Sequence, residues 1–211
     1  MLQLLGRPTS INVRKVQWLC DELSLACTLQ PWGAGVRDTH TPGFLALNPN
    51  GLVPVLVEPR PEGDFVLWES NTICRYLAAR EGRHDLLPAA PRERARVEQW
   101  MDWQAGELNN AWRYAFMHLV RKSAAHPDPQ AAMASVVQWN RHMALLDAQL
   151  ARTGAYAAGA DFTLADIVLS LATCRWLTAP IDRPGLPAVA AYVERLKARP
   201  GFLRHALNGV P

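Results

Sequence analysis

The sequence predicts an α/β domain followed by an all-helical domain, and three observations point to this fold class. In residues 1–80, short apolar runs alternate with stretches whose apolar residues recur every three or four positions, the patterns of strands and of helices. Residues 81–91 contain a glycine and two prolines and lack periodicity, which is typical of a linker. Residues 92–211 show helical spacing alone. We therefore expect two domains, 1–80 and 92–211, joined by the linker 81–91.

The first domain is expected to follow the order βαβαββα. Four apolar runs predict its strands, at residues 2–5, 27–32, 54–57 and 65–68. Three stretches with helical spacing or start signals predict its helices, at residues 13–23, 41–47 and 70–80. Thr41 is suited to cap the short middle helix because Pro42 follows it at the first helical position.

The second domain is expected to contain helices only. Their predicted positions are residues 92–121, residues 130–152, a helix that opens at Thr163 and a last helix over residues 187–199. At the third helix, Thr163 can cap the first turn, and Asp166 can reach back to the cap N–H. Phe162 and Ile167 occupy the two positions of a hydrophobic staple.

The composition indicates an ordinary folded protein of 211 residues with 49% apolar residues. The net charge of +3 is small and the basic residues are scattered, which argues against nucleic-acid binding. The sequence has no signal peptide pattern and no run long enough for a membrane span, so we expect a cytoplasmic protein without a membrane partner. Four cysteines without CxxC or zinc spacing predict reduced, buried thiols and no disulfide, metal or cofactor.

Residues 48–70 contain two features of a ligand-binding turn. Pro54 stands where a strand residue would normally donate a hydrogen bond, directly after the turn Asn48–Gly51. Ser70 follows the strand at 65–68 and starts a helix, whose N-terminus favours anions.

These motifs, in this order, resemble the soluble glutathione transferases over essentially the whole chain. The resemblance rests on three segments: Asn48-Pro49 with Val53-Pro54, Trp68 to Asn71 ahead of Ile73, and the capping box from Thr163 to Asp166. It implies a thioredoxin-like first domain that binds glutathione as a substrate and a variable pocket for a second substrate beside the helical domain. It also implies a homodimer, with Trp100, Asp102 and Trp103 towards the partner.

The resemblance implies a contact for each part of glutathione. With a cis Pro54, the backbone of Val53 would pair with the cysteinyl unit like an added strand. Ser70 would bind the γ-glutamyl carboxylate, and Glu69 would bind the adjacent ammonium group. His40 lies where relatives hold the glycyl carboxylate. Many relatives carry Lys where this chain has Leu52, so Arg37 or His40 is expected to replace that contact.

Catalysis requires that the glutathione thiol be ionised, because the thiolate is the nucleophile. The turn before the first helix offers Thr9, Ser10 and Asn12 as hydrogen-bond donors, at a helix N-terminus where the dipole favours an anion. In the family pattern a catalytic Ser or Cys stands six residues before a helix valine, which selects Ser10; Thr9 and Asn12 are alternatives. The first 75 residues contain no tyrosine, which excludes the tyrosine-type classes and favours serine or cysteine types, theta-like or beta-like.

The second-substrate pocket is expected near Trp112 and Tyr114, in an aromatic-rich part of the helix 92–121. The function expected from the resemblance is conjugation of glutathione to small apolar electrophiles, as in detoxification. Two alternatives remain open: glutathione-dependent reduction of disulfides or peroxides, and a non-catalytic glutathione-binding module.

Overall fold

The computed structural model describes residues 1–210, and its contacts divide the chain into two compact units. The first unit is Met1–His84, and the second begins at Asp85. The linker predicted at residues 81–91 spans this division.

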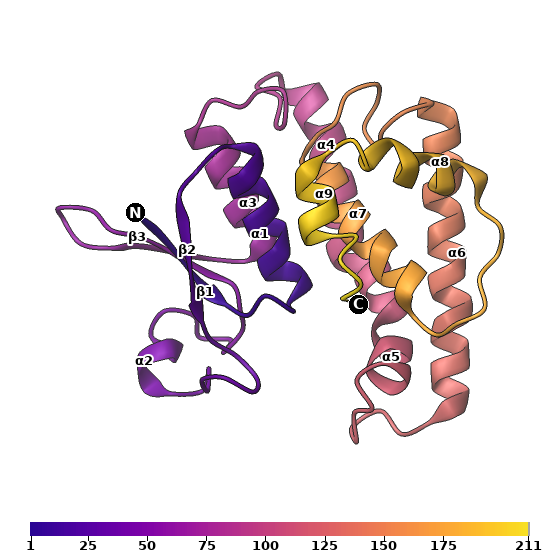
Figure 1. The fold of residues 1–211 in the computed structure, drawn as a ribbon, viewed down its shortest axis with the longest axis horizontal. Helices are drawn as coiled ribbons and strands as arrows, with labels where there is room; N and C mark the ends of the chain where they lie inside the picture. Colours follow the sequence, from indigo (N-terminus) through magenta and orange to yellow (C-terminus); the bar gives the residue numbers. More distant parts are fainter. Residues whose placement is uncertain (211) are drawn as a thin grey trace. The chain divides into compact units, whose positions relative to one another are not determined.

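The first unit has the predicted order βαβαββα (Figure 1). Its elements are β1 (Leu2–Gly6), α1 (Ile11–Glu22), β2 (Cys27–Pro31), α2 (Pro42–Leu45), β3 (Val55–Glu58), β4 (Phe65–Trp68) and α3 (Ser70–Arg80). The four strands form one sheet in the order β2-β1-β3-β4. β1 and β2 are parallel, whereas β3 is antiparallel to both β1 and β4. The predicted order of elements is confirmed.

The two faces of this sheet are covered by different helices. Helices α1 and α3 pack against each other and lie on the same side of the sheet in Figure 1. On the other face Phe44 of α2 packs with Leu5, Val55 and Val57. Neighbouring strand residues point to opposite faces, so Leu4 is buried away from that cluster while Leu5 belongs to it. The alternation therefore fixes the register between β1 and β3.

The second unit is helical, as predicted. Its elements are α4 (Pro91–Trp103), a π-helical segment (Gln104–Leu108), α5 (Asn109–Leu119), α6 (Pro129–Thr153), α7 (Leu164–Thr178), α8 (Pro187–Leu196) and α9 (Pro200–His205). Every residue of α7 from Leu164 to Trp176 is buried, which makes α7 the central helix of this unit. The capping box at its start is formed, since the Thr163 N–H donates to Asp166 Oδ2 at 2.9 Å. Across residues 1–210, none of the helices is long and apolar enough to cross a membrane.

Three expectations about local structure were wrong. The helix expected over 92–121 is interrupted by the π-helical segment, in which the buried Gln104 side chain donates to Asn109 Oδ1 at 2.7 Å. The last predicted helix ends at Leu196, because Pro200 begins a separate helix, α9, rather than closing the previous one. Cys27 was expected to be buried, but its position at the start of β2 leaves it partly exposed.

Candidate active site

The strand register brings four chain segments to one end of the sheet. Leu5 pairs with Val55, which also pairs with Trp68, and Gly6 pairs with Pro31. The segments next to these residues are therefore neighbours: 7–12 after β1, 32–40 after β2, 53–54 before β3 and 69–70 after β4. These four segments contain every residue that the sequence predicted for glutathione binding and for thiol activation.

Ser10 is the N-cap residue of α1, and its side chain makes no capping hydrogen bond. Its backbone is extended, with φ −82° and ψ 122°, and its carbonyl accepts the Arg14 N–H at 3.0 Å. The hydroxyl does not make the side-chain capping bond that is usual at this position. Ser10 is partly buried, whereas Thr9 is exposed and Asn12, also partly buried, is the second residue of the helix. The Ser10 hydroxyl is therefore available to donate to a ligand at the helix N-terminus.

The segment before β3 presents unpaired backbone groups. The Val53–Pro54 peptide bond is cis, as predicted. Within residues 1–210 no partner is found for the Val53 N–H or C=O, although the carbonyl of Leu52 accepts Asn48 Nδ2 at 2.8 Å. Val53 thus carries one free donor and one free acceptor, the pair that an extended peptide needs in order to add a strand.

The segment after β4 combines backbone strain with a helix N-terminus. Glu69 has φ 71° and ψ 110°, a conformation that is rare outside glycine, and its side chain is exposed. Ser70 is the first residue of α3 and is only 5% exposed. Asn71 is anchored beneath it, because the buried Lys15 Nζ donates to Asn71 Oδ1 at 3.3 Å. This hydrogen bond ties the start of α3 to α1.

The loop after β2 encloses a hollow of about 470 Å³, lined by residues 33–40. His40 lies on its rim with an exposed ring, and the Asp38 carboxylate accepts both the His40 backbone N–H (2.9 Å) and Nδ1 (3.3 Å). The backbone hydrogen bond from His40 lowers the pKa of Asp38 below its usual value. The ring also meets the turn before β3, since a Cβ on Gly51 would lie 3.1 Å from His40 Nε2. His40 is thus close to the segment that carries Val53.

Sequence reasoning missed Arg7, which connects two of these segments. Arg7 Nη1 donates to the Ala34 carbonyl at 3.2 Å, and its side chain packs on Gly33 together with Val53. Nothing in the local sequence distinguishes Arg7 from an ordinary turn residue, because its partners are at least 26 positions away. Arg7 fixes the loop after β2 to the turn that carries Ser10.

The position where relatives have Lys is occupied by Leu52, which is 63% exposed. A cation is nevertheless near the loop: the Arg37 guanidinium carbon lies 4.6 Å from the centre of the Trp32 ring. That stacking limits the freedom of the guanidinium while leaving its N–H groups available. Arg37 and His40 are the candidates for the contact that Leu52 does not make.

In the second unit, the side chains of Trp112 and Tyr114 both contact other residues of that unit. Trp112 packs edge-on against Phe116, and the Arg175 guanidinium lies 4.6 Å from the centre of its indole ring. The Tyr114 hydroxyl accepts the Asp128 N–H at 3.0 Å, and its ring contacts His126. These contacts give both residues structural roles and do not test the predicted pocket.

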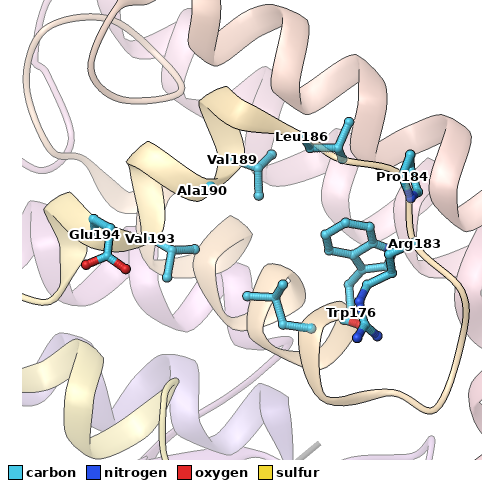
Figure 2. Close-up of a pocket in the computed structure, with 9 residues that line it drawn as sticks. Trp176, Arg183, Pro184, Leu186, Val189, Ala190, Val193 and Glu194 are labelled. Carbon is cyan, nitrogen blue, oxygen red and sulfur yellow. The ribbon is translucent and has the colours of Figure 1, made fainter.

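A hollow of about 320 Å³ in this unit lies elsewhere, at the end of α7 (Figure 2). Figure 2 shows the residues that line this hollow, among them Trp176 of α7 and Val189 and Val193 of α8. Trp176 Nε1 donates to Asn140 Oδ1 at 2.8 Å, and Arg183 Nη1 donates to the carbonyls of Trp176 and Ala179. The hollow is therefore preformed, and its walls are mainly apolar. Across residues 1–210, His, Cys, Asp and Glu side chains do not gather in a group of three that could hold a metal ion.

Comparisons with known proteins cover the whole chain. The family model for the glutathione S-transferase N-terminal domain matches residues 4–85, and that for the C-terminal domain matches residues 109–200. Glutathione S-transferase GstB of Escherichia coli (strain K12) is 38% identical over 200 residues, covering 95% of each chain. The Disulfide-bond oxidoreductase YfcG of the same strain is 29% identical over 203 residues, covering 95% of this chain and 92% of YfcG.

A solved structure is similar to this chain in both fold and sequence. The theta class glutathione S-transferase from Xanthomonas axonopodis pv. citri, with glutathione bound, superposes with a TM-score of 0.88 at 37% identity. The match covers 100% of this chain and 99% of that one.

Proposed function

The chain belongs to the glutathione S-transferase family, and from this premise we propose that it is a glutathione transferase that joins the glutathione thiolate to small apolar electrophiles. The observation that carries the proposal is the full-length similarity to a theta class enzyme whose structure holds glutathione. The grouping of the predicted contacts at one end of the sheet supports it.

Glutathione binding is assigned to three of the four segments at this end of the sheet: 53–54, 69–70 and 32–40. The free N–H and C=O of Val53 pair with the cysteinyl unit as an added strand does. The γ-glutamyl carboxylate is bound at the N-terminus of α3, by the Ser70 hydroxyl and the Ser70 backbone N–H. Glu69 binds the neighbouring ammonium group through its exposed carboxylate. Opposite charges of the zwitterion thus meet complementary groups.

The glycyl carboxylate is assigned to the loop after β2. His40 reaches the rim of this loop, and Arg37 supplies a fixed positive charge. The Asp38 carboxylate accepts hydrogen bonds from the His40 backbone N–H and Nδ1, so Asp38 already positions the His40 ring before a ligand binds. Arg37 therefore makes the stronger electrostatic contact with a carboxylate in this proposal.

Ser10 is assigned the activation of the thiol. An unperturbed thiol has a pKa of about 8.5, so only a few per cent is ionised at neutral pH. Lowering that pKa by two units requires about 2.7 kcal/mol of preferential stabilisation. A hydrogen bond to a charged group contributes roughly 1.5–3 kcal/mol, and the N-terminus of α1 adds up to about 1 kcal/mol. One hydroxyl at the N-cap of α1 is therefore sufficient.

Further parts of the proposal concern the second substrate and the assembly. We assign small apolar electrophiles to a pocket that includes Trp112 and Tyr114, and we expect a cytoplasmic homodimer. Trp100 and Trp103, whose ring centres are 5.1 Å apart, lie on the helix expected to face the partner. Family membership supports these assignments.

Glutathione-dependent disulfide reduction is the second candidate, and the similarity to YfcG favours it. In that reaction the same bound thiolate attacks a sulfur atom instead of a carbon atom. The binding site is shared, so the two candidates differ only in the electrophile that reacts.

The proposal is tested by calorimetric titration with glutathione, followed by assays with a nitroaryl halide and with hydroxyethyl disulfide. Binding together with conjugation supports the proposal, whereas binding with disulfide reduction alone supports the second candidate. S-methylglutathione serves as the control ligand, because it retains the binding groups and has no reactive thiol. Absence of glutathione binding at millimolar concentration would rule out both activities.

A further inference from the structure

Two cysteines lie on either side of a tight reversal of the chain between α1 and β2. Cys20 is in the last turn of α1, and Cys27 is the first residue of β2. Between them the Leu25 N–H donates to the Cys20 carbonyl at 2.8 Å, and the Ser24 N–H donates to Asp21 at 3.1 Å. Ser24 has φ 53°, as the left-handed residue of a Schellman motif requires. This closed turn returns the chain to Cys20 within seven residues.

The side chains of Cys20 and Cys27 influence each other's ionisation. A hydrogen bond between the thiols raises the pKa of Cys20, and the same bond lowers the pKa of Cys27. Cys27 is partly exposed, whereas Cys20 is 3% exposed. Cys27 therefore has the accessibility of an attacking thiol and a pKa shifted in the direction that favours the thiolate, and the turn keeps Cys20 nearby.

The pair is remote from the proposed glutathione site. Cys27 pairs with Leu2 at the start of β1, whereas the site segments adjoin Gly6 at the other end of that strand. Cys74 in α3 also lies near Cys20, but it is fully buried, and burial raises its pKa to about 12. Cys74 is thus an inert thiol under ordinary conditions.

We propose that Cys20 and Cys27 are a redox modification site, at which a small disulfide such as glutathione disulfide converts the two thiols into an intramolecular disulfide. The turn that joins them supplies the proximity, and the partial exposure of Cys27 supplies the entry point.

The exchange proceeds in two steps that balance in atoms and electrons. The Cys27 thiolate attacks one sulfur of glutathione disulfide, forms a mixed disulfide and releases one glutathione thiolate. Cys20 then loses its proton, and its sulfur attacks the Cys27 sulfur and releases the second glutathione. Once Cys27 is in the mixed disulfide, it no longer accepts the hydrogen bond that held the proton on Cys20. Two protein thiols are oxidised while one disulfide is reduced to two thiols.

The sequence allows a direct test by mass spectrometry. Trypsin cleaves after Lys15 and after Arg37, so one peptide, 16–37, contains both cysteines and neither Cys74 nor Cys174. The folded full-length protein is incubated with glutathione disulfide, and its free thiols are blocked with N-ethylmaleimide before digestion. We expect the peptide to appear two hydrogens lighter and without N-ethylmaleimide, and to revert after dithiothreitol.

Two variants separate the steps. Cys20→Ser is expected to leave a glutathione on Cys27, because the second step is lost, and Cys27→Ser is expected to leave Cys20 unmodified. Cys174→Ser, in the second unit, is the matched control and should form the lighter peptide as the unmodified protein does. The proposal is overturned if peptide 16–37 of the unmodified protein carries two N-ethylmaleimide groups, retains one glutathione, or becomes linked to Cys74 under an excess of glutathione disulfide. That readout needs no variant to fold.

Discussion

At the scale of single residues, Glu69 joins a strained backbone to a proposed ligand contact. Its φ of 71° is a conformation that glycine adopts more readily. We predict that Glu69→Gly weakens glutathione binding about 10- to 100-fold, because a charge-assisted hydrogen bond of roughly 1.5–3 kcal/mol is lost. The free energy of unfolding should stay the same or rise by up to about 1 kcal/mol, since the strain is relieved. Calorimetric titration and urea denaturation measure the two quantities.

Ser24→Gly is the matched control for this prediction. Ser24 has φ 53° and is exposed, but it lies in the turn after α1 and outside the four site segments. The same relief of strain is expected there without any change in glutathione affinity. If Glu69→Gly bound glutathione as tightly as Ser24→Gly, Glu69 would have no role in binding.

Some site residues could be predicted from sequence and others could not, for physical reasons. Ser70 follows a strand that stops abruptly, so its place at a helix N-terminus is encoded locally. The positive φ of Glu69 is not, because glutamate has no preference for it and tertiary structure imposes it. Arg7 was missed because its contact with Ala34 depends on the pairing of β1 with β2.

At the scale of elements, the start of α7 depends on one buried carboxylate. Asp166 Oδ1 accepts the Ala157 N–H at 2.9 Å and the Tyr192 hydroxyl at 3.1 Å, while Oδ2 accepts the Thr163 N–H. We predict that Asp166→Ala lowers the free energy of unfolding by about 2–4 kcal/mol, because a cap is lost and buried donors are left unpaired. Chemical denaturation measures the loss, and Asp161→Ala, an exposed residue in the preceding loop, is the control.

The same carboxylate gives stability a pH dependence. Burial raises the pKa of Asp166 to about 6, above its usual value of 3.8. A carboxyl group whose pKa is raised in the folded state stabilises the fold at pH below 3.8, and this contribution is lost as pH rises towards 6. At about 1.4 kcal/mol per pKa unit, the loss is on the order of 3 kcal/mol.

Asp166→Asn cannot titrate and isolates this effect. The difference in free energy of unfolding between the unmodified protein and Asp166→Asn should fall as pH rises from about 4 to 6. Subtracting the two curves removes the opposite trend of carboxylates such as Glu58, whose pKa is lowered chiefly by the hydrogen bond from Tyr76. A difference that is constant across this range would show that Asp166 has an ordinary pKa.

Element boundaries were predicted best where capping signals are local. The start of α7 and the whole of α3 follow such signals, from Thr163 and from the stop after Trp68. The π-helical segment Gln104–Leu108 has no such signal, since it depends on a buried contact between side chains five residues apart. α9 was missed because a proline can begin a helix as well as follow one.

At the scale of the whole molecule, the proposal predicts a dimer. Met133 and Val137 lie one turn apart on α6 and are 70% and 63% exposed, which leaves an apolar pair without cover among the described residues. Light scattering after gel filtration should give twice the 23.4 kDa mass of one chain. Val137→Glu should shift this mass towards one chain, whereas Leu203→Glu, at an exposed apolar residue of α9, should not. A monomeric unmodified protein would contradict the prediction.

Ionisation of bound glutathione by Ser10 can be measured from the thiolate absorbance of the glutathione complex as a function of pH. We predict an apparent thiol pKa about two units below the free value of about 8.5 in the unmodified protein, and a return close to that value in Ser10→Ala. Thr9→Ala and Asn12→Ala, which change the neighbouring donors, should leave the lowered pKa in place. If the apparent pKa stayed lowered in Ser10→Ala with glutathione still bound, Ser10 would not be the activating group, and the role would pass to another donor of the same turn.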